Sequence, residues 1–136
     1  MLGELDRRNY QVVESAEEAD VLVVNTCGFI EQSQRESVET VQSLAAIKRP
    51  GQRLIVAGCL SQLYAEQVRE AVPAVDHVFG VGQWDQVART LSVDVLELHD
   101  IPASAVEVRG PSAYLKISDG CDAPCTFCVI PKIKGN

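Results

Sequence analysis

The stretch VLVVNTC, residues 21–27, decides the fold when it is set beside RLIVAGC, residues 53–59. Each stretch contains a run of Val, Leu, Ile or Ala and ends in a cysteine that has a glycine next to it. Runs of β-branched residues and leucine without polar alternation are typical of strands buried on both faces of a parallel sheet. We therefore predict two neighbouring parallel strands, at residues 21–25 and 53–57, in an α/β domain.

The segment between these strands has the pattern of an amphipathic helix over residues 31–48. Its apolar positions recur every three or four residues, which places them on one helical face. They are Val38, Val41, Leu44 and Ala45. Pro50 and Gly51 are expected to end this helix and turn the chain into the second strand.

Further βα units follow in the sequence. A second helical face is predicted from Tyr64, Val68, Ala71 and Val72, ending at Pro73. A short strand at residues 77–81 and a short helix at residues 84–91 come next, and Val12 and Val13 suggest a brief edge strand. Right-handed crossovers would wind these units into a three-layer α/β domain with a parallel sheet.

The periodicity divides the chain into three parts. Residues 1–91 form the predicted α/β domain, opening with a helix at residues 2–8 that no strand precedes. Residues 92–111 are a predicted linker with a short strand at 95–98, because Pro and Gly interrupt the pattern there. Residues 112–136 contain one further predicted strand, YLKI at 114–117, which leads into a loop rich in cysteine. Both ends of the chain are those expected of a piece of a longer protein.

Composition narrows the class of protein. A chain of 136 residues can form one ordinary domain, and its apolar runs are far shorter than the ~20 residues of a membrane span. No secretion signal is recognisable, so we expect a cytoplasmic protein whose thiols stay reduced. The five cysteines are an odd number, which argues against a closed disulfide framework. The net charge of −7 weighs against nucleic acid as a partner of this chain.

Cys27 and Cys59 each follow a predicted parallel strand. The carboxyl ends of parallel strands are where open α/β sheets bind ligands, and neighbouring strands lie ~5 Å apart. These two thiols could therefore approach a common ion or cluster. The alternative is that both are small buried apolar side chains, as free cysteines often are. Two thiols are too few for a complete site, so a third ligand would have to come from elsewhere.

Three cysteines, Cys121, Cys125 and Cys128, form a tighter group with the spacing Cys-x3-Cys-x2-Cys. In a reducing compartment such a group favours metal over packing, and iron–sulfur over zinc. Three thiolates can hold three corners of a 4Fe–4S cluster and leave one iron open to a small molecule with an amino nitrogen and a carboxylate oxygen. A dithiol formed by Cys125 and Cys128 is a weaker alternative, because it leaves Cys121 unexplained.

The motif CDAPCTFC, residues 121–128, resembles the cluster motif of the radical S-adenosylmethionine (SAM) enzymes. In those enzymes the cluster passes an electron to bound SAM, which splits to methionine and a 5′-deoxyadenosyl radical. The resemblance implies that Cys121, Cys125 and Cys128 hold a 4Fe–4S cluster. It also implies that Phe127 lies near the adenine of SAM and that residues 114–117 form the first strand of a barrel.

The stretches VVNTCGFI, VAGCLSQ and YLKISDGC are together similar to the methylthiotransferases among these enzymes. That family carries a second 4Fe–4S cluster on three cysteines of its amino-terminal domain, and Cys27 and Cys59 match two of them. The third follows a first strand that has no counterpart here, so the resemblance implies that this chain supplies two of the three ligands of the second cluster. The resemblance covers nearly all of the chain, while the chain covers about a third of such an enzyme.

The continuation NTCGFI, followed by a long acidic helix, most resembles the branch that acts on a small-subunit ribosomal protein. The resemblance implies addition of a methylthio group to the β-carbon of an aspartate, with two SAM molecules per product and an electron donor such as flavodoxin or ferredoxin. The tRNA adenosine branch is the alternative substrate class. A non-catalytic iron–sulfur or zinc-binding interaction module is the alternative of another kind. The fragment by itself is expected to be inactive and marginally stable.

Overall fold

The computed structural model describes residues 11–91, 120–123 and 125–135. The predicted helix at 2–8, the linker at 92–111 and the predicted strands at 95–98 and 114–117 lie outside these residues. The predicted edge strand at Val12 and Val13 is wrong, since this segment has no regular structure and Val12 is 69% exposed.

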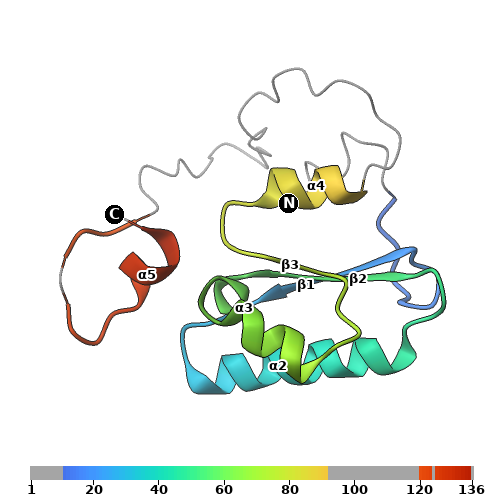
Figure 1. Ribbon diagram of the computed structural model, residues 1–136, viewed down its shortest axis with the longest axis horizontal. Coiled ribbons are helices and arrows are strands. Elements are labelled where there is room, and N and C mark those ends of the chain that lie inside the picture. Colours follow the sequence, from blue (N-terminus) through green and yellow to red (C-terminus); the bar gives the residue numbers. More distant parts are fainter. Residues whose placement is uncertain (1–10, 92–119, 124, 136) are drawn as a thin grey trace, which may run out of the picture.

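Three parallel strands form the sheet, as predicted (Figure 1). They are β1 (Val21–Thr26), β2 (Arg53–Gly58) and β3 (His77–Phe79), in the order β1-β2-β3. The strand predicted at residues 77–81 ends at Phe79, because Val81 and Gly82 form a turn. β2 lies between the other two strands, which explains why its sequence is apolar at almost every position.

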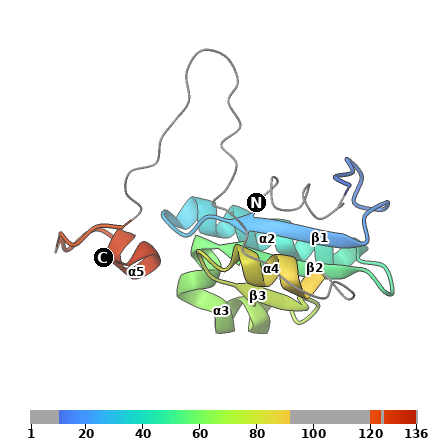
Figure 2. The ribbon, with the colours of Figure 1, turned by 90° about the horizontal axis from the view of Figure 1, so that it is seen from above.

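The described residues form four helices: α2 (Glu31–Ile47), α3 (Cys59–Ala71), α4 (Trp84–Leu91) and α5 (Ile130–Lys134). α2 and α3 cover one face of the sheet and α4 covers the other (Figures 1 and 2). Within the first of these layers, α2 lies nearer to β1 and α3 lies nearer to β3. The predicted three-layer α/β architecture is thus confirmed for the described residues.

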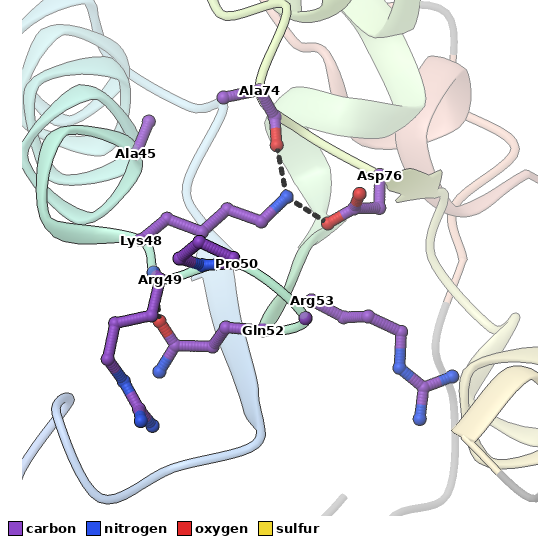
Figure 3. A pocket seen from close by; sticks show the side chains of 9 residues that line it. Ala45, Lys48, Arg49, Pro50, Gln52, Arg53, Ala74 and Asp76 are labelled. Atoms are coloured by element: carbon purple, nitrogen blue, oxygen red, sulfur yellow. Dashed lines mark hydrogen bonds and ion pairs between the residues drawn. The ribbon is translucent and has the colours of Figure 1, made fainter.

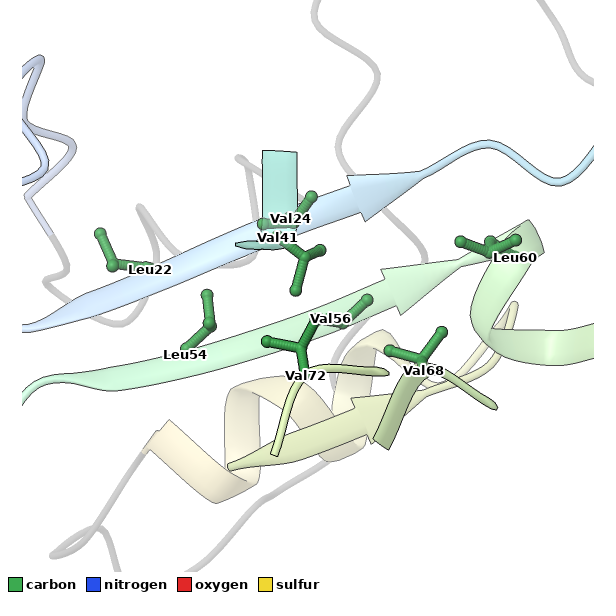
Figure 4. Packing of buried hydrophobic residues seen from close by; sticks show 8 residues of the cluster. All are labelled: Leu22, Val24, Val41, Leu54, Val56, Leu60, Val68 and Val72. Carbon is green, nitrogen blue, oxygen red and sulfur yellow. The ribbon is translucent and has the colours of Figure 1, made fainter. Parts of the chain in front are cut away.

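The main core lies between the sheet and the layer of α2 and α3 (Figure 4). Leu54 and Val56 of β2 are fully buried there, and Val41 of α2 is 1% exposed. Burial of each such side chain contributes roughly 1.5–3 kcal/mol. The remaining members of this cluster are Leu22, Val24, Leu60, Val68 and Val72.

A smaller core lies on the opposite face of the sheet. Ile55 of β2 is fully buried there against Val87 and Leu91 of α4. Successive residues of a strand point to opposite faces, so Leu54 and Ile55 serve the two cores in turn. Because of this alternation, the single strand β2 packs against both helical layers.

The predicted α2 face is confirmed, because Val38, Leu44 and Ala45 pack against the core around Val41. The prediction for α3 is only partly right. Val68 and Val72 are buried, whereas Tyr64 is 39% exposed and has non-helical angles of φ −137° and ψ 39°. This break at Tyr64 turns the helix, so the first turn after Cys59 and the remainder of α3 do not share one continuous face.

Candidate metal centre

Cys27 and Cys59 occupy equivalent positions at the carboxyl edge of the sheet. The parallel register ends with Thr26 opposite Gly58, and each cysteine is the next residue of its own chain segment. Strands in such a pair lie about 4.8 Å apart. The structure therefore brings the backbones of the two cysteines together, and both side chains are half-buried.

Two glycines make this close approach possible. A Cβ atom on Gly28 would lie 2.9 Å from the carbonyl carbon and oxygen of Cys59. Gly58 has a φ of +113°, which L side chains rarely adopt, and a Cβ atom there would lie 2.6 Å from the carbonyl oxygen of Thr26. Larger residues at either position would push the two strand ends apart.

Two buried hydroxyl groups connect the same strand ends through hydrogen bonds. The Thr26 hydroxyl donates to the carbonyl oxygen of Ala57 at 2.8 Å and lies 3.3 Å from the hydroxyl oxygen of Ser61 in the first turn of α3. Thr26 and Ser61 are 4% and 2% exposed, so this hydrogen-bonded contact is shielded from water. It ties β1, β2 and α3 together at Thr26, the residue before Cys27.

The carboxyl edge also receives the amino-terminal ends of two helices. α3 begins at Cys59 itself, and α2 begins at Glu31, four residues after Cys27. The N-terminus of a helix carries partial positive charge and favours negatively charged groups. In the described part of the chain, neither N-cap residue, Ile30 or Gly58, caps its helix through a side chain. The electrostatic setting suits a negatively charged ligand group.

The cysteine loop lies near this same edge. α5 follows the loop directly and packs against α3, with Ile133 only 4% exposed (Figure 1). The Cys121 N–H donates to the carbonyl oxygen of Gly135 at 3.2 Å, which closes the loop onto the end of α5. α5, which follows the cysteine loop, thus lies on the side of the molecule where α2 and α3 begin (Figures 1 and 2).

All five cysteines are free of disulfide bonds. Cys121 and Cys125 are exposed, Cys128 is half-buried and Phe127 is 88% exposed. Within the described ranges, no three His, Cys, Asp or Glu side chains are gathered closely enough to hold a metal ion. The donor set itself fits iron–sulfur chemistry, because it consists of accessible free thiols. The ligand roles of the five cysteines and the position of Phe127 near SAM stay predictions.

Comparison with known proteins decides the family. Residues 1–80 match the profile described as uncharacterized protein family UPF0004.

The chain belongs to the UPF0004 family.

Similar proteins named ribosomal protein uS12 methylthiotransferase RimO occur in several bacteria. This UPF0004 chain is 40% identical to the one from Clostridioides difficile (strain 630), 42% to that from Anaeromyxobacter sp. (strain K) and 39% to that from Helicobacter acinonychis (strain Sheeba). Each match covers 99% of this chain but only 34%, 31% and 32% of the respective relative. The predicted resemblance to the methylthiotransferases is confirmed. The chain spans about a third of the length of these relatives.

Sequence reasoning missed several polar residues around Cys27. Ser37 and Gln34 of α2 hydrogen-bond to the backbone of Cys27 and Gly28, and Ser61 contacts Thr26. Nothing in their spacing marks Ser37 or Gln34, since polar residues on a helix usually face solvent. Only the arrangement of α2 beside the end of β1 reveals these contacts.

A cavity of about 550 Å³ lies at the opposite, amino-terminal edge of the UPF0004 sheet (Figure 3). Lys48, Arg49 and Arg53 line it, but their charged ends point in different directions. Lys48 Nζ donates to Asp76 and to the carbonyl oxygen of Ala74. The two arginines donate to other backbone carbonyls, so these cations connect separate segments of the chain rather than converge on a ligand.

Asp76 is the acidic partner in this arrangement. One carboxylate oxygen accepts hydrogen bonds from Lys48 Nζ and from the N–H of Leu54, each at 2.6 Å. Partial burial raises the pKa of Asp76, but these hydrogen bonds and the charge of Lys48 outweigh it and leave the pKa below its usual value. The ionised form of Asp76 therefore links α2, β2 and β3 at the amino-terminal edge.

Proposed function

We propose that this chain is part of a radical SAM methylthiotransferase that modifies the β-carbon of an aspartate in ribosomal protein uS12. The observation that carries the proposal is the sequence identity of 39–42% over 99% of the chain to relatives named for that activity. The names of these relatives favour the ribosomal protein over tRNA as the substrate. The net charge of −7 agrees with a protein partner rather than nucleic acid.

In this proposal the cysteines serve two iron–sulfur sites. Cys121, Cys125 and Cys128 would hold a 4Fe–4S cluster, which would supply the electron needed to cleave SAM. Cys27 and Cys59 are two of the ligands of a second 4Fe–4S cluster, and their third partner is not among the cysteines of this chain. Phe127 lies beside Cys128 in sequence and would contact the adenine of SAM.

The described residues give the chain three tasks in this chemistry. Gly28 and Gly58 allow the two strand ends to approach each other, and the Thr26–Ser61 contact fixes them. The packing of α5 on α3 anchors the cysteine loop at its carboxyl end. The exposed thiols of Cys121 and Cys125 remain accessible for cluster insertion.

The proposed partners follow from the same assignment. An electron donor such as flavodoxin or ferredoxin would reduce the cluster, and the ribosomal protein would be the substrate. The expected compartment is the cytoplasm, where thiols stay reduced. In the part of the chain that the structure describes, no helix has the length and hydropathy of a membrane span.

The first experiment reconstitutes the chain anaerobically with iron and sulfide. Electron paramagnetic resonance spectra of the reduced protein are recorded with and without SAM, beside a Cys125→Ala variant and a matched Cys27→Ala variant. A four-iron signal that SAM perturbs, that Cys125→Ala loses and that Cys27→Ala keeps supports the proposal. Tight zinc binding without such a signal would overturn it in favour of a metal-binding interaction module.

The substrate is tested separately in cells. Mass spectrometry of uS12 and of tRNA nucleosides is compared between cells with and without the gene for the protein that contains this chain. Loss of the methylthio group from uS12 alone is the expected result. Its loss from tRNA adenosine alone would assign the protein to the tRNA-modifying class.

A further inference from the structure

The two cysteines at the sheet edge are held in different ways. Cys59 is the first residue of α3, and the buried strand β2 precedes it. Cys27 instead lies in the connection between β1 and α2, where residues 27–30 form neither helix nor strand. The main-chain position of Cys27 therefore depends on contacts from outside its own segment.

Two side chains of α2 supply such contacts. The N–H of Cys27 donates to Ser37 Oγ at 3.1 Å, and the Ser37 hydroxyl lies 3.5 Å from the carbonyl oxygen of the same cysteine. A hydroxyl group can accept one hydrogen bond and donate another, so it can serve both backbone groups of one residue. Gln34 Nε2 donates to the carbonyl oxygen of Gly28 at 2.9 Å.

The behaviour of neighbouring hydroxyls shows that the contact of Ser37 is distinctive. Thr40 and Ser43, on the same helix, each donate to the carbonyl oxygen four residues earlier, at 2.8 Å. Such back-bonding is the usual local choice of Ser and Thr inside a helix. Among the described contacts, Ser37 instead reaches ten residues back along the chain to Cys27.

Gln34 and Ser37 are three residues apart and therefore lie on the same side of α2. The side chain of Gln32, by comparison, bonds to Glu36 on the exposed surface of the helix. α2 itself is fixed on the sheet through Val41, which is 1% exposed. A rigid helix thus carries both groups that contact the Cys27 segment.

We infer that Ser37 and Gln34 are positioning residues that hold Cys27 at a fixed place beside Cys59, so that the two thiols act as a pair toward a thiol-binding metal or metalloid. This inference rests on the proposed function, in which both cysteines bind one cluster. It assigns to α2 a part in building the site that no cysteine motif reveals. Because Cys27 is already held in place before binding, less conformational entropy is lost when both thiols bind one metal or metalloid atom.

Phenylarsine oxide tests the inference without any cluster or activity assay. Its arsenic(III) forms two As–S bonds with a pair of thiols and releases one water, with no change of oxidation state. Cys121, Cys125 and Cys128 are replaced by Ser in every sample, so that binding reports on Cys27 and Cys59 alone. Affinity is measured in competition with a small dithiol, and a Cys59→Ser version defines binding to a single thiol.

Ser37→Ala is expected to weaken arsenical binding about fivefold to tenfold, which is the scale of one lost hydrogen bond. Ser37→Thr keeps the hydroxyl and should restore binding to within about twofold of the parent. Gln34→Ala should weaken binding about threefold to fivefold. Ser43→Ala and Gln32→Ala are the matched controls on the same helix, and neither should change the affinity.

Equal affinity of the parent, Ser37→Ala and Gln34→Ala would overturn the inference while leaving the paired thiols intact. A parent that binds no better than its Cys59→Ser version would overturn both the inference and the shared site of Cys27 and Cys59 in the proposed function. If Ser37→Ala proves unfolded by circular dichroism, Gln34→Ala decides, and unchanged affinity there overturns the inference.

Discussion

Gly28 lies directly against the backbone of Cys59: a Cβ atom on the glycine would be 2.9 Å from both the carbonyl carbon and the carbonyl oxygen of the cysteine. The first turn of α3 therefore packs against the segment that carries Cys27 with no room for a side chain between them. This contact between main chains keeps the two cysteine-bearing segments close together.

Gly28→Ala should lower the free energy of unfolding by about 1–3 kcal/mol, because the methyl group must displace backbone rather than a flexible side chain. Urea unfolding followed by circular dichroism measures the change. Gly82→Ala is the comparison, since it has open space around it but a φ of +83°. That conformational cost alone is about 1–2 kcal/mol. An unfolding free energy unchanged by Gly28→Ala would show that the strand ends separate easily.

Replacing cysteines one at a time should show that the bound iron occupies two independent sites. Cys128→Ala is expected to abolish the SAM-sensitive signal of the reconstituted chain, because two thiolates no longer hold three corners of a cluster. Cys59→Ala should lower the iron content without altering that signal. Iron analysis and electron paramagnetic resonance on the same samples provide the check. A signal that disappears equally in both variants would mean that the five thiols serve one common site.

Asp76→Asn should change how stability depends on pH. The native pKa of Asp76 lies below its usual value, so its ionised form adds stability above the unfolded pKa of about 3.9. That stability is lost as the pH falls through the native pKa. The variant should be less stable by roughly 1–2 kcal/mol at pH 7, and the difference should shrink toward pH 2.

Urea unfolding at pH 7, 4 and 2.5 measures the difference in unfolding free energy between the parent and Asp76→Asn. Glu66→Gln serves as the control, because Glu66 forms an exposed ion pair with Arg69 and should contribute little at any pH. A gap between parent and Asp76→Asn that stays constant down to the lowest pH would contradict the assignment to the ionised carboxylate.

Arg53→Ala should detach the end of α4 from β2. Arg53 donates to the carbonyl oxygens of Thr90 at 2.8 Å and Leu91 at 3.3 Å, both in the last turn of α4. We expect a loss of about 1–2 kcal/mol in unfolding free energy. Arg53→Lys keeps the charge at the helix C-terminus and should recover about 0.3–1 kcal/mol. Arg35→Ala, in an exposed pair with Glu31, should change stability by less than about 0.5 kcal/mol.

The sheet was predictable because its signal is local and strong. The apolar runs around Val24 and Val56 predict strands that are buried on both faces of a sheet. The helical periodicity around Val41 predicts the helix that covers one of these faces. Parallel pairing then predicts that the backbones of Cys27 and Cys59 lie near each other. Fold class and the approach of these two backbones needed no information beyond the sequence.

Other features depend on contacts that the sequence does not encode locally. The start of α3 at Cys59 depends on the φ of +113° at Gly58, which allows the strand to turn at once into a helix. Val12 is apolar yet exposed, because a two-residue apolar pair carries too little burial to determine pairing. The contact of Ser37 with Cys27 appears only after α2 has docked on the sheet.

The break in α3 at Tyr64 has a mechanical consequence. The short segment that starts at Cys59 is separated by one non-helical residue from the segment that places Val68 in the core. Leu60 in the Cys59 turn and Val68 beyond the break are both buried in the main core. The two parts of α3 are thus anchored to the sheet separately, so the Cys59 turn keeps its place even if the rest of the helix shifts.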